Sequence, residues 1–98
     1  MAIIAILECH FKPEQVEAGI DWLRRNLVAT RAFGGCLGVE VFEDGDDPSR
    51  VVAVEHWASL EHDRAYRAWR DGEGRIVEGG DLFVGPPRLT VGVVRDDV

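Results

Sequence analysis

One amphipathic segment near the middle of the chain carries the side chains best suited to bind an aromatic molecule. Its members recur at three- and four-residue spacing and should share one helical stripe: His62, Ala65, Tyr66 and Trp69. Arg64 and Arg67 fall outside this stripe and are expected to point away from it. Rings joined to a phenol hydroxyl can line a pocket. Such rings also fill ordinary cores, so both a pocket and simple packing on a sheet remain open.

The apolar segment that precedes this stripe ends in Glu55, His56 and Trp57. Trp57 should lie on the same side as Glu55 and Ala53, where its ring could form a cavity wall or belong to the core. A carboxylate in so apolar a strand needs a partner such as an arginine. We therefore expect Glu55 to form a buried salt bridge rather than to act as a general acid.

The remaining titratable residues predict no metal or cofactor site. Glu8, His10 and His56 have no metal-ligand spacing, and each histidine is expected at a polar rim or an interface. The sequence has no P-loop, dinucleotide fingerprint or nucleophile elbow. Cys9 and Cys36 form no CxxC pair and are expected to be two reduced, buried thiols. No metal and no cofactor are expected.

Length and composition predict one small soluble domain. The chain has 98 residues, of which 46% are hydrophobic and 30% are charged, so a single domain over residues 1–98 is expected. A net charge of −7 argues against nucleic acid as a partner. The apolar start meets Glu8 too early to span a bilayer and lacks the basic flank of a signal peptide. We expect a cytoplasmic protein with no membrane partner.

Hydrophobic periodicity and turn residues predict four strands and two helices. The strands are expected at residues 2–11, 36–43, 50–57 and 88–94, and the helices at residues 13–32 and 59–71. Residues 95–98 should form a frayed tail. The order is β-α-β-β-α-β, which predicts a ferredoxin-like α+β fold with an antiparallel sheet and both helices on one face.

The first and third strands are apolar on both sides. Ile4 and Ile6 lie opposite the side that should face the helices, and so do Val52 and Val54. Two helices cover only one face of a four-stranded sheet. A second copy of the chain is the simplest cover for the other face, so a homodimer is expected.

Two stretches resemble the antibiotic biosynthesis monooxygenase family. They run from Thr30 to Val41 and from Val54 to Ser59, and the likeness extends to Lys12-Pro13 and Gly85-Pro86-Pro87. The resemblance implies a dimeric α/β barrel with a substrate pocket between sheet and helices. It further implies oxidation of anthrones or quinols by molecular oxygen without metal or flavin.

The family's functional residues carry over only in part. Trp57 matches a tryptophan of the anthrone-oxidising members, but Ala53 stands where they have an asparagine, and Arg75 matches an arginine after the second helix. Trp69 is similar to a tryptophan of haem-degrading relatives. Their histidine downstream of that tryptophan and their asparagine on the first strand are absent here.

The sequence therefore predicts a cofactor-independent monooxygenase that acts with O2 on a small aromatic molecule, such as an anthrone, a quinol or a polyketide-type phenol. Trp57 and Tyr66 are the predicted catalytic residues. The predicted substrate-binding residues are Trp69, His62, Phe33 and Arg75. A non-catalytic ligand-binding or accessory dimer of the same fold is the alternative, and haem degradation is less favoured.

Overall fold

The computed structural model describes residues 2–98 and has four strands and two α-helices in the predicted order. The strands are β1 (Ile3–His10), β2 (Cys36–Glu43), β3 (Arg50–Trp57) and β4 (Arg88–Val93). The helices are α1 (Val16–Ala32) and α2 (Leu60–Asp71), and two 3-10 turns, η1 (Pro13–Gln15) and η2 (Gly80–Leu82), flank them. Met1, the start of the predicted domain, lies outside the described residues.

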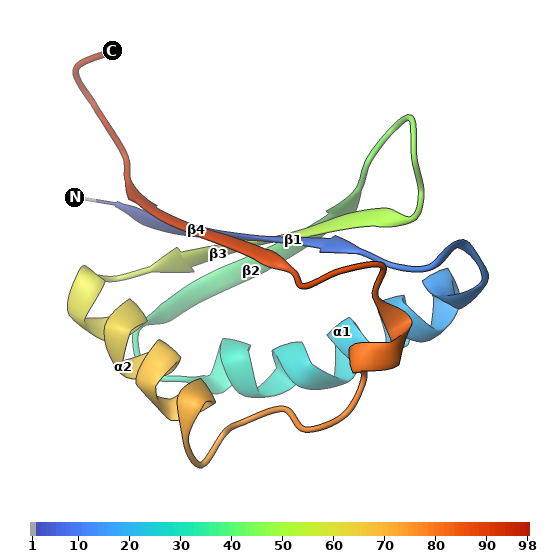
Figure 1. Cartoon of the computed structure of the whole chain (residues 1–98). Helices are drawn as coiled ribbons and strands as arrows, with labels where there is room; N and C mark the ends of the chain where they lie inside the picture. The colour runs from blue at the N-terminus through green and yellow to red at the C-terminus, as the bar shows by residue number, and fades with distance from the viewer. Residues whose placement is uncertain (1) are drawn as a thin grey trace.

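The strands form one open antiparallel sheet in the order β2-β3-β1-β4, with β2 and β4 at its edges. Ile3 in β1 pairs with Trp57 in β3 and with Val93 in β4. Both helices lie on the same face of this sheet (Figure 1). The structure thus confirms the predicted ferredoxin-like α+β fold.

Local sequence explains where each helix begins. Pro13 was expected to open the first helix directly, but it opens a 3-10 turn in which Gln15 N–H donates to the Lys12 carbonyl at 2.8 Å. The α-helix starts only at Val16. Ser59 caps α2 as predicted, because its hydroxyl accepts a hydrogen bond from the His62 backbone N–H at 3.2 Å.

The face of the sheet that the helices cover contains two groups of buried side chains. The first, which we name the apolar cluster, consists of Cys9, Phe11, Trp22, Leu23, Leu27, Val51, Ala53 and Phe83. The second, the aromatic cluster, consists of Ile3, Ala5, Trp57 and Tyr66, against which Phe33 and Trp69 pack. The two clusters lie toward opposite ends of β1 and β3.

The other face of the sheet is uncovered in the single chain. Ile4, Ile6, Val52 and Val54 lie on it and are half-buried by their neighbours alone. None of the helices within residues 2–98 is both long enough and apolar enough to cross a membrane. At the C-terminal end, Arg95 pairs with Asp97 in an exposed turn.

The two thiols differ more than the sequence predicted. Both cysteines are free, but only Cys9 is buried, whereas Cys36 is half-exposed because it begins the edge strand β2. Burial raises the pKa of the Cys9 thiol from 9.0 to about 11.

Candidate functional site

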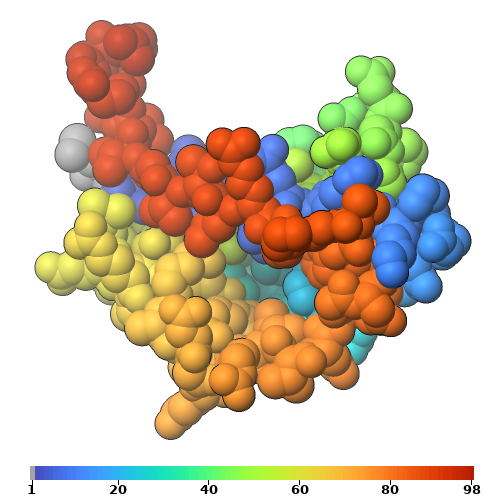
Figure 2. Space-filling view, in the orientation of Figure 1, coloured from blue at the N-terminus to red at the C-terminus, as the bar shows by residue number. Residues whose placement is uncertain are grey.

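A cavity of about 620 Å³ lies between the sheet and the helices. Its walls come from β1, β3, α1, α2 and the segment 75–87 that joins α2 to β4. In the space-filling view it is a hollow between the sheet and this segment, with residues of α1 at its floor (Figure 2). Leu7, Leu23, Leu27, Ile76 and Phe83 supply apolar wall. The space between sheet and helices is therefore open.

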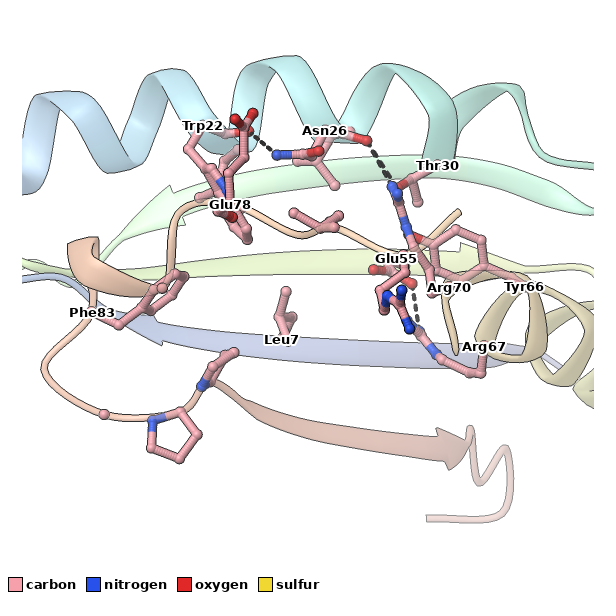
Figure 3. A pocket seen from close by; sticks show the side chains of 18 of the residues that line it. Leu7, Trp22, Asn26, Thr30, Glu55, Tyr66, Arg67, Arg70, Glu78 and Phe83 are labelled. Carbon is pink, nitrogen blue, oxygen red and sulfur yellow. Dashed lines mark hydrogen bonds and ion pairs between the residues drawn. The ribbon is translucent and has the colours of Figure 1, made fainter. Parts of the chain in front are cut away.

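A hydrogen-bond network joins the two helices at one end of the cavity (Figure 3). Arg70 donates from Nε to the Tyr66 hydroxyl at 2.8 Å and from Nη2 to Thr30 Oγ1 at 3.1 Å. The same guanidinium reaches the carbonyls of Asn26 and Gly74 at 2.9 and 3.0 Å. The Tyr66 and Thr30 hydroxyls lie 2.6 Å apart. These bonds fix the Tyr66 ring and leave a cation beside the cavity.

A second network surrounds Glu55, whose side chain is only 2% exposed. Arg67 Nη2 donates to Glu55 Oε1 at 2.6 Å and to Asp63 Oδ1 at 3.0 Å, and Trp57 Nε1 donates to the same Glu55 oxygen at 3.0 Å. The predicted salt bridge of Glu55 is thus confirmed. Glu55 and Arg67 both line the cavity.

The structure corrects the predicted stripe on α2. Asp63 and Tyr66 are the buried residues of α2, whereas His62 and Ala65 are exposed. The His62 side chain instead contacts the helix cap, since the Ser59 hydroxyl and His62 Nδ1 lie 2.7 Å apart. Arg67 points inward, although the prediction placed it on the outer side. Helical spacing alone placed Arg67 outside the stripe, but two buried carboxylates draw its long side chain toward the sheet.

The predicted aromatic residues form a group behind the cavity wall. Trp57 is 1% exposed, and its ring centroid lies 5.0 Å from that of Tyr66 and 6.2 Å from that of Phe33. The Trp69 ring packs on Phe33 at 5.5 Å and lies 4.8 Å from the Arg70 guanidinium. Of this group, only Tyr66 lines the cavity. Arg75 lines it from the segment after α2.

Four polar residues of the cavity wall were missed by sequence reasoning: Asn26, Thr30, Arg70 and Glu78. Asn26 and Thr30 follow Trp22 at intervals of four, so the three share one stripe of α1, and all three line the cavity. Polar residues on the buried stripe of a helix are a usable signal. Arg70 gave no such signal, because an arginine in the last helical turn is commonly explained by the helix dipole.

No cluster of three or more His, Cys, Asp or Glu side chains within residues 2–98 is placed to hold a metal ion. The cavity wall also contains no histidine among these residues. A haem with histidine ligation therefore does not fit this site.

Solved structures show the same fold. Rv0793 from Mycobacterium tuberculosis is similar, with a TM-score of 0.78 and 21% identity over 99% of this chain and 98% of the other. PA3566 from Pseudomonas aeruginosa has a TM-score of 0.77 and 22% identity over 96% and 94%. SO0527 from Shewanella oneidensis has a TM-score of 0.73 and 20% identity over 93% and 88%.

A comparison with curated proteins finds no match. A family model described as antibiotic biosynthesis monooxygenase matches residues 2–74, from β1 through the end of α2. This range holds strands β1 to β3, both helices and the two polar networks beside the cavity. The chain therefore belongs to the antibiotic biosynthesis monooxygenase family.

Proposed function

We propose that the protein is a cofactor-independent monooxygenase that oxidises a small aromatic molecule with O2 in the cavity between sheet and helices. The observation that carries this proposal is the Arg70 guanidinium on the wall of a cavity whose other side is lined by apolar residues. Its four hydrogen bonds within the described residues all go to uncharged oxygens. A half-buried cation without an acidic partner favours an anionic ligand, such as a phenolate or enolate.

The chemistry needs such an anion. An electron-rich aromatic anion can pass an electron to O2 directly, and the two fragments then combine. For an anthrone, the methylene loses both hydrogens and gains one oxygen atom, while the second oxygen atom leaves as water. The substrate supplies all four electrons, so the stoichiometry requires no other reductant. The protein's contribution is to hold the anion and keep water away from it.

We assign the predicted site residues by where they lie. Tyr66 and Arg75 line the cavity and are proposed to contact the substrate. Trp57, Phe33 and Trp69 pack around the Tyr66 ring and are proposed to hold it in place. His62 is exposed, and we assign it no contact with the substrate.

We propose that two copies pack through the uncovered sheet face. Proteins of this family are generally dimers, and Ile4, Ile6, Val52 and Val54 give this face the apolar character of an interface. Sedimentation of Val54→Glu against wild type tests the assignment, with a dimer expected for wild type and a monomer for the variant. A stable wild-type monomer at micromolar concentration would contradict it.

We place the protein in the cytoplasm, because two free thiols suit a reducing compartment.

The activity is tested by oxygen uptake. Purified protein is mixed with anthrones and quinols that are kept reduced under anaerobic conditions until the assay starts. Arg70→Met should lower kcat/KM by about 100-fold, because the substrate anion loses its counter-charge. Arg24→Met is the matched control, since Arg24 is exposed on α1 and pairs with Asp21. The proposal fails if wild type consumes no oxygen with any member of the panel.

One observation favours a second function, a non-catalytic ligand-binding protein. Ala53 is fully buried in the apolar cluster and stands where the resemblance led us to expect an asparagine. The site thus lacks an amide that related oxygenases have. Saturable quenching of tryptophan fluorescence by an aromatic ligand, with no oxygen uptake and no product, would support binding over catalysis.

A further inference from the structure

We propose that Glu55 is the catalytic residue that accepts the substrate's proton, so that the substrate becomes an anion inside the cavity. This inference rests on the proposed function, which requires a deprotonated substrate but names no proton acceptor. It assigns a chemical step to a side chain that the sequence predicted to be purely structural. It also defines the substrate class as phenols or enolisable ketones that bind in their neutral form.

The two oxygens of the Glu55 carboxylate have different surroundings. Oε1 accepts both hydrogen bonds, from Trp57 Nε1 at 3.0 Å and from Arg67 Nη2 at 2.6 Å. Oε2 accepts no hydrogen bond from residues 2–98. Among the described residues, the fully buried side-chain atom without a hydrogen-bond partner is Arg67 Nε, so Oε2 is not itself fully buried. Glu55 is 2% exposed and lines the cavity, and we infer that Oε2, the oxygen without a partner, is the one that faces it. The carboxylate is thus held by one oxygen and presents the other.

The charges around Glu55 favour the uptake of one proton by its carboxylate. Glu55 and Asp63 share the single guanidinium of Arg67, so this buried group carries one negative charge in excess. A proton on Oε2 removes that excess and leaves the Arg67–Asp63 pair balanced. Arg70, Arg75 and the Tyr66 hydroxyl, together with Glu78, are the other ionisable groups of the cavity wall. Arg70 would then attract the anion that the proton transfer creates.

The step balances without any further reagent. The C–H or O–H bond of the substrate breaks, its proton binds Glu55 Oε2, and the electron pair stays on the substrate as an enolate or phenolate. Molecular oxygen, which the proposed function already supplies, is the only oxidant. The proton leaves Glu55 when the water of the overall reaction forms.

Other groups of the cavity are less suited to this step. Glu78 is the other carboxylate on its wall, but its side chain is 72% exposed and lies 3.5 Å from Arg25. The Tyr66 hydroxyl is already engaged by Arg70 and Thr30. A general base should be within hydrogen-bond reach of the substrate and sheltered from solvent. Glu55 lines the cavity and is sheltered from solvent, whereas Glu78 is not sheltered.

The test separates proton transfer from oxidation. Wild type, Glu55→Gln and Glu78→Gln are mixed with dithranol, an enolisable anthrone, without oxygen, and the absorption spectrum reports whether the bound molecule is ionised. Wild type and Glu78→Gln should bind it as the anion. Glu55→Gln keeps an oxygen for Trp57 and Arg67, so it should bind dithranol with similar affinity but in the neutral form. After oxygen is admitted, its kcat should be lower by at least about 100-fold.

Each outcome decides between the two proposals. Anion formation in wild type but not in Glu55→Gln would support the proton acceptor even where neither protein consumes oxygen, and the oxygenase is overturned separately if wild type consumes no oxygen across the whole panel. Oxygen uptake that Glu55→Gln leaves unchanged, or an anion in both proteins, would overturn the proton acceptor alone. Binding only in the neutral form, or no binding, to wild type would overturn it as well.

A second measurement covers the case in which Glu55→Gln does not fold. The infrared difference spectrum of wild type on anaerobic dithranol binding should gain a protonated carboxyl band. Glu78→Gln and Asp63→Asn should gain the same band, which assigns it to Glu55. Absence of the band from wild type overturns the proposal.

Discussion

The two clusters on the covered face of the sheet differ in the kinds of side chain that form and surround them. The apolar cluster closes around Phe11, whose ring lies 4.9 Å from that of Phe83 and contacts Gly19 so closely that an added Cβ would come within 2.5 Å of it. The aromatic cluster instead borders two polar networks that hold buried carboxylates and a tyrosine hydroxyl. Buried charges contribute less to stability than apolar side chains of equal size. The comparison therefore assigns most of the stability, together with the apolar wall of the cavity, to the first cluster, and the polar chemistry of the cavity to the networks beside the second.

The largest expected loss of stability is at the apolar cluster. Phe11→Ala should lower the free energy of unfolding by about 3–5 kcal/mol, because it removes a fully buried ring from tight packing. Urea denaturation measures this change. Ligand affinity of the protein that remains folded should match wild type. A loss of affinity at full folding would show that the two clusters are not separate in role.

At the polar side, Arg67→Met should lower the free energy of unfolding by about 2–4 kcal/mol, because it leaves two buried carboxylates without a counter-charge. The Arg67 side chain is 24% exposed, so water limits the loss. The same denaturation experiment on Arg67→Met combined with Glu55→Gln and Asp63→Asn is the control. This triple variant should recover most of the lost stability, and a further decrease would show that packing, not charge, is what Arg67 supplies.

The apolar cluster also contains one titratable group, the Cys9 thiol, whose effect on the free energy of unfolding depends on pH. Below pH 9 the Cys9 thiol is protonated in folded and unfolded protein, so it has no effect on stability. Between pH 9 and about 11 only the unfolded protein loses this proton, because burial raises the pKa of Cys9 in the fold. Stability should fall by about 1.4 kcal/mol per pH unit in this window. Denaturation of Cys9→Ala over the same pH range should lack this contribution, and equal slopes would refute the assignment.

The smallest expected effect is that of Tyr66→Phe. Loss of the hydroxyl removes its contacts with Arg70 and Thr30 and should lower the free energy of unfolding by about 1 kcal/mol, measured by thermal denaturation. Oxygen uptake and ligand affinity should fall more clearly than stability does. Val28→Ala, at an exposed position of α1, provides a neutral reference. Unchanged affinity in Tyr66→Phe would remove this residue from the ligand site.

The sequence was sufficient to predict the fold because each element carries its own local signal. The Val16, Ile20, Leu23 and Leu27 spacing predicts α1, the polar run at Asp44–Ser49 predicts the hairpin, and Ser59 predicts the start of α2. The exact start of α1 was not predictable, because the same proline suits a 3-10 turn and an α-helix equally well.

The site was predicted less completely, because it depends on contacts between residues far apart in the chain. Arg67 turns inward only because Glu55, twelve positions earlier, is buried beneath it. Arg70 donates a hydrogen bond to Thr30 on the other helix, and no pattern within α2 predicts this contact. Tyr66 was found because a ring and a hydroxyl on a buried stripe are visible in sequence. The hydrogen-bond partners of its hydroxyl, Thr30 and Arg70, were not predicted.

The segment 75–87 has a consequence for how proteins of this fold diversify. It closes one side of the cavity, yet it lies beyond the residues that the family model matches. Its contacts with the rest of the fold include the bond from Trp22 Nε1 to the Glu78 carbonyl and the close approach of Gly79, with φ of 98°, to the same indole. Loops of this kind accept insertions and exchanges that strands do not. Selectivity for a new molecule can therefore evolve in this segment while Glu55, Arg67 and Arg70, which lie outside it, stay as they are.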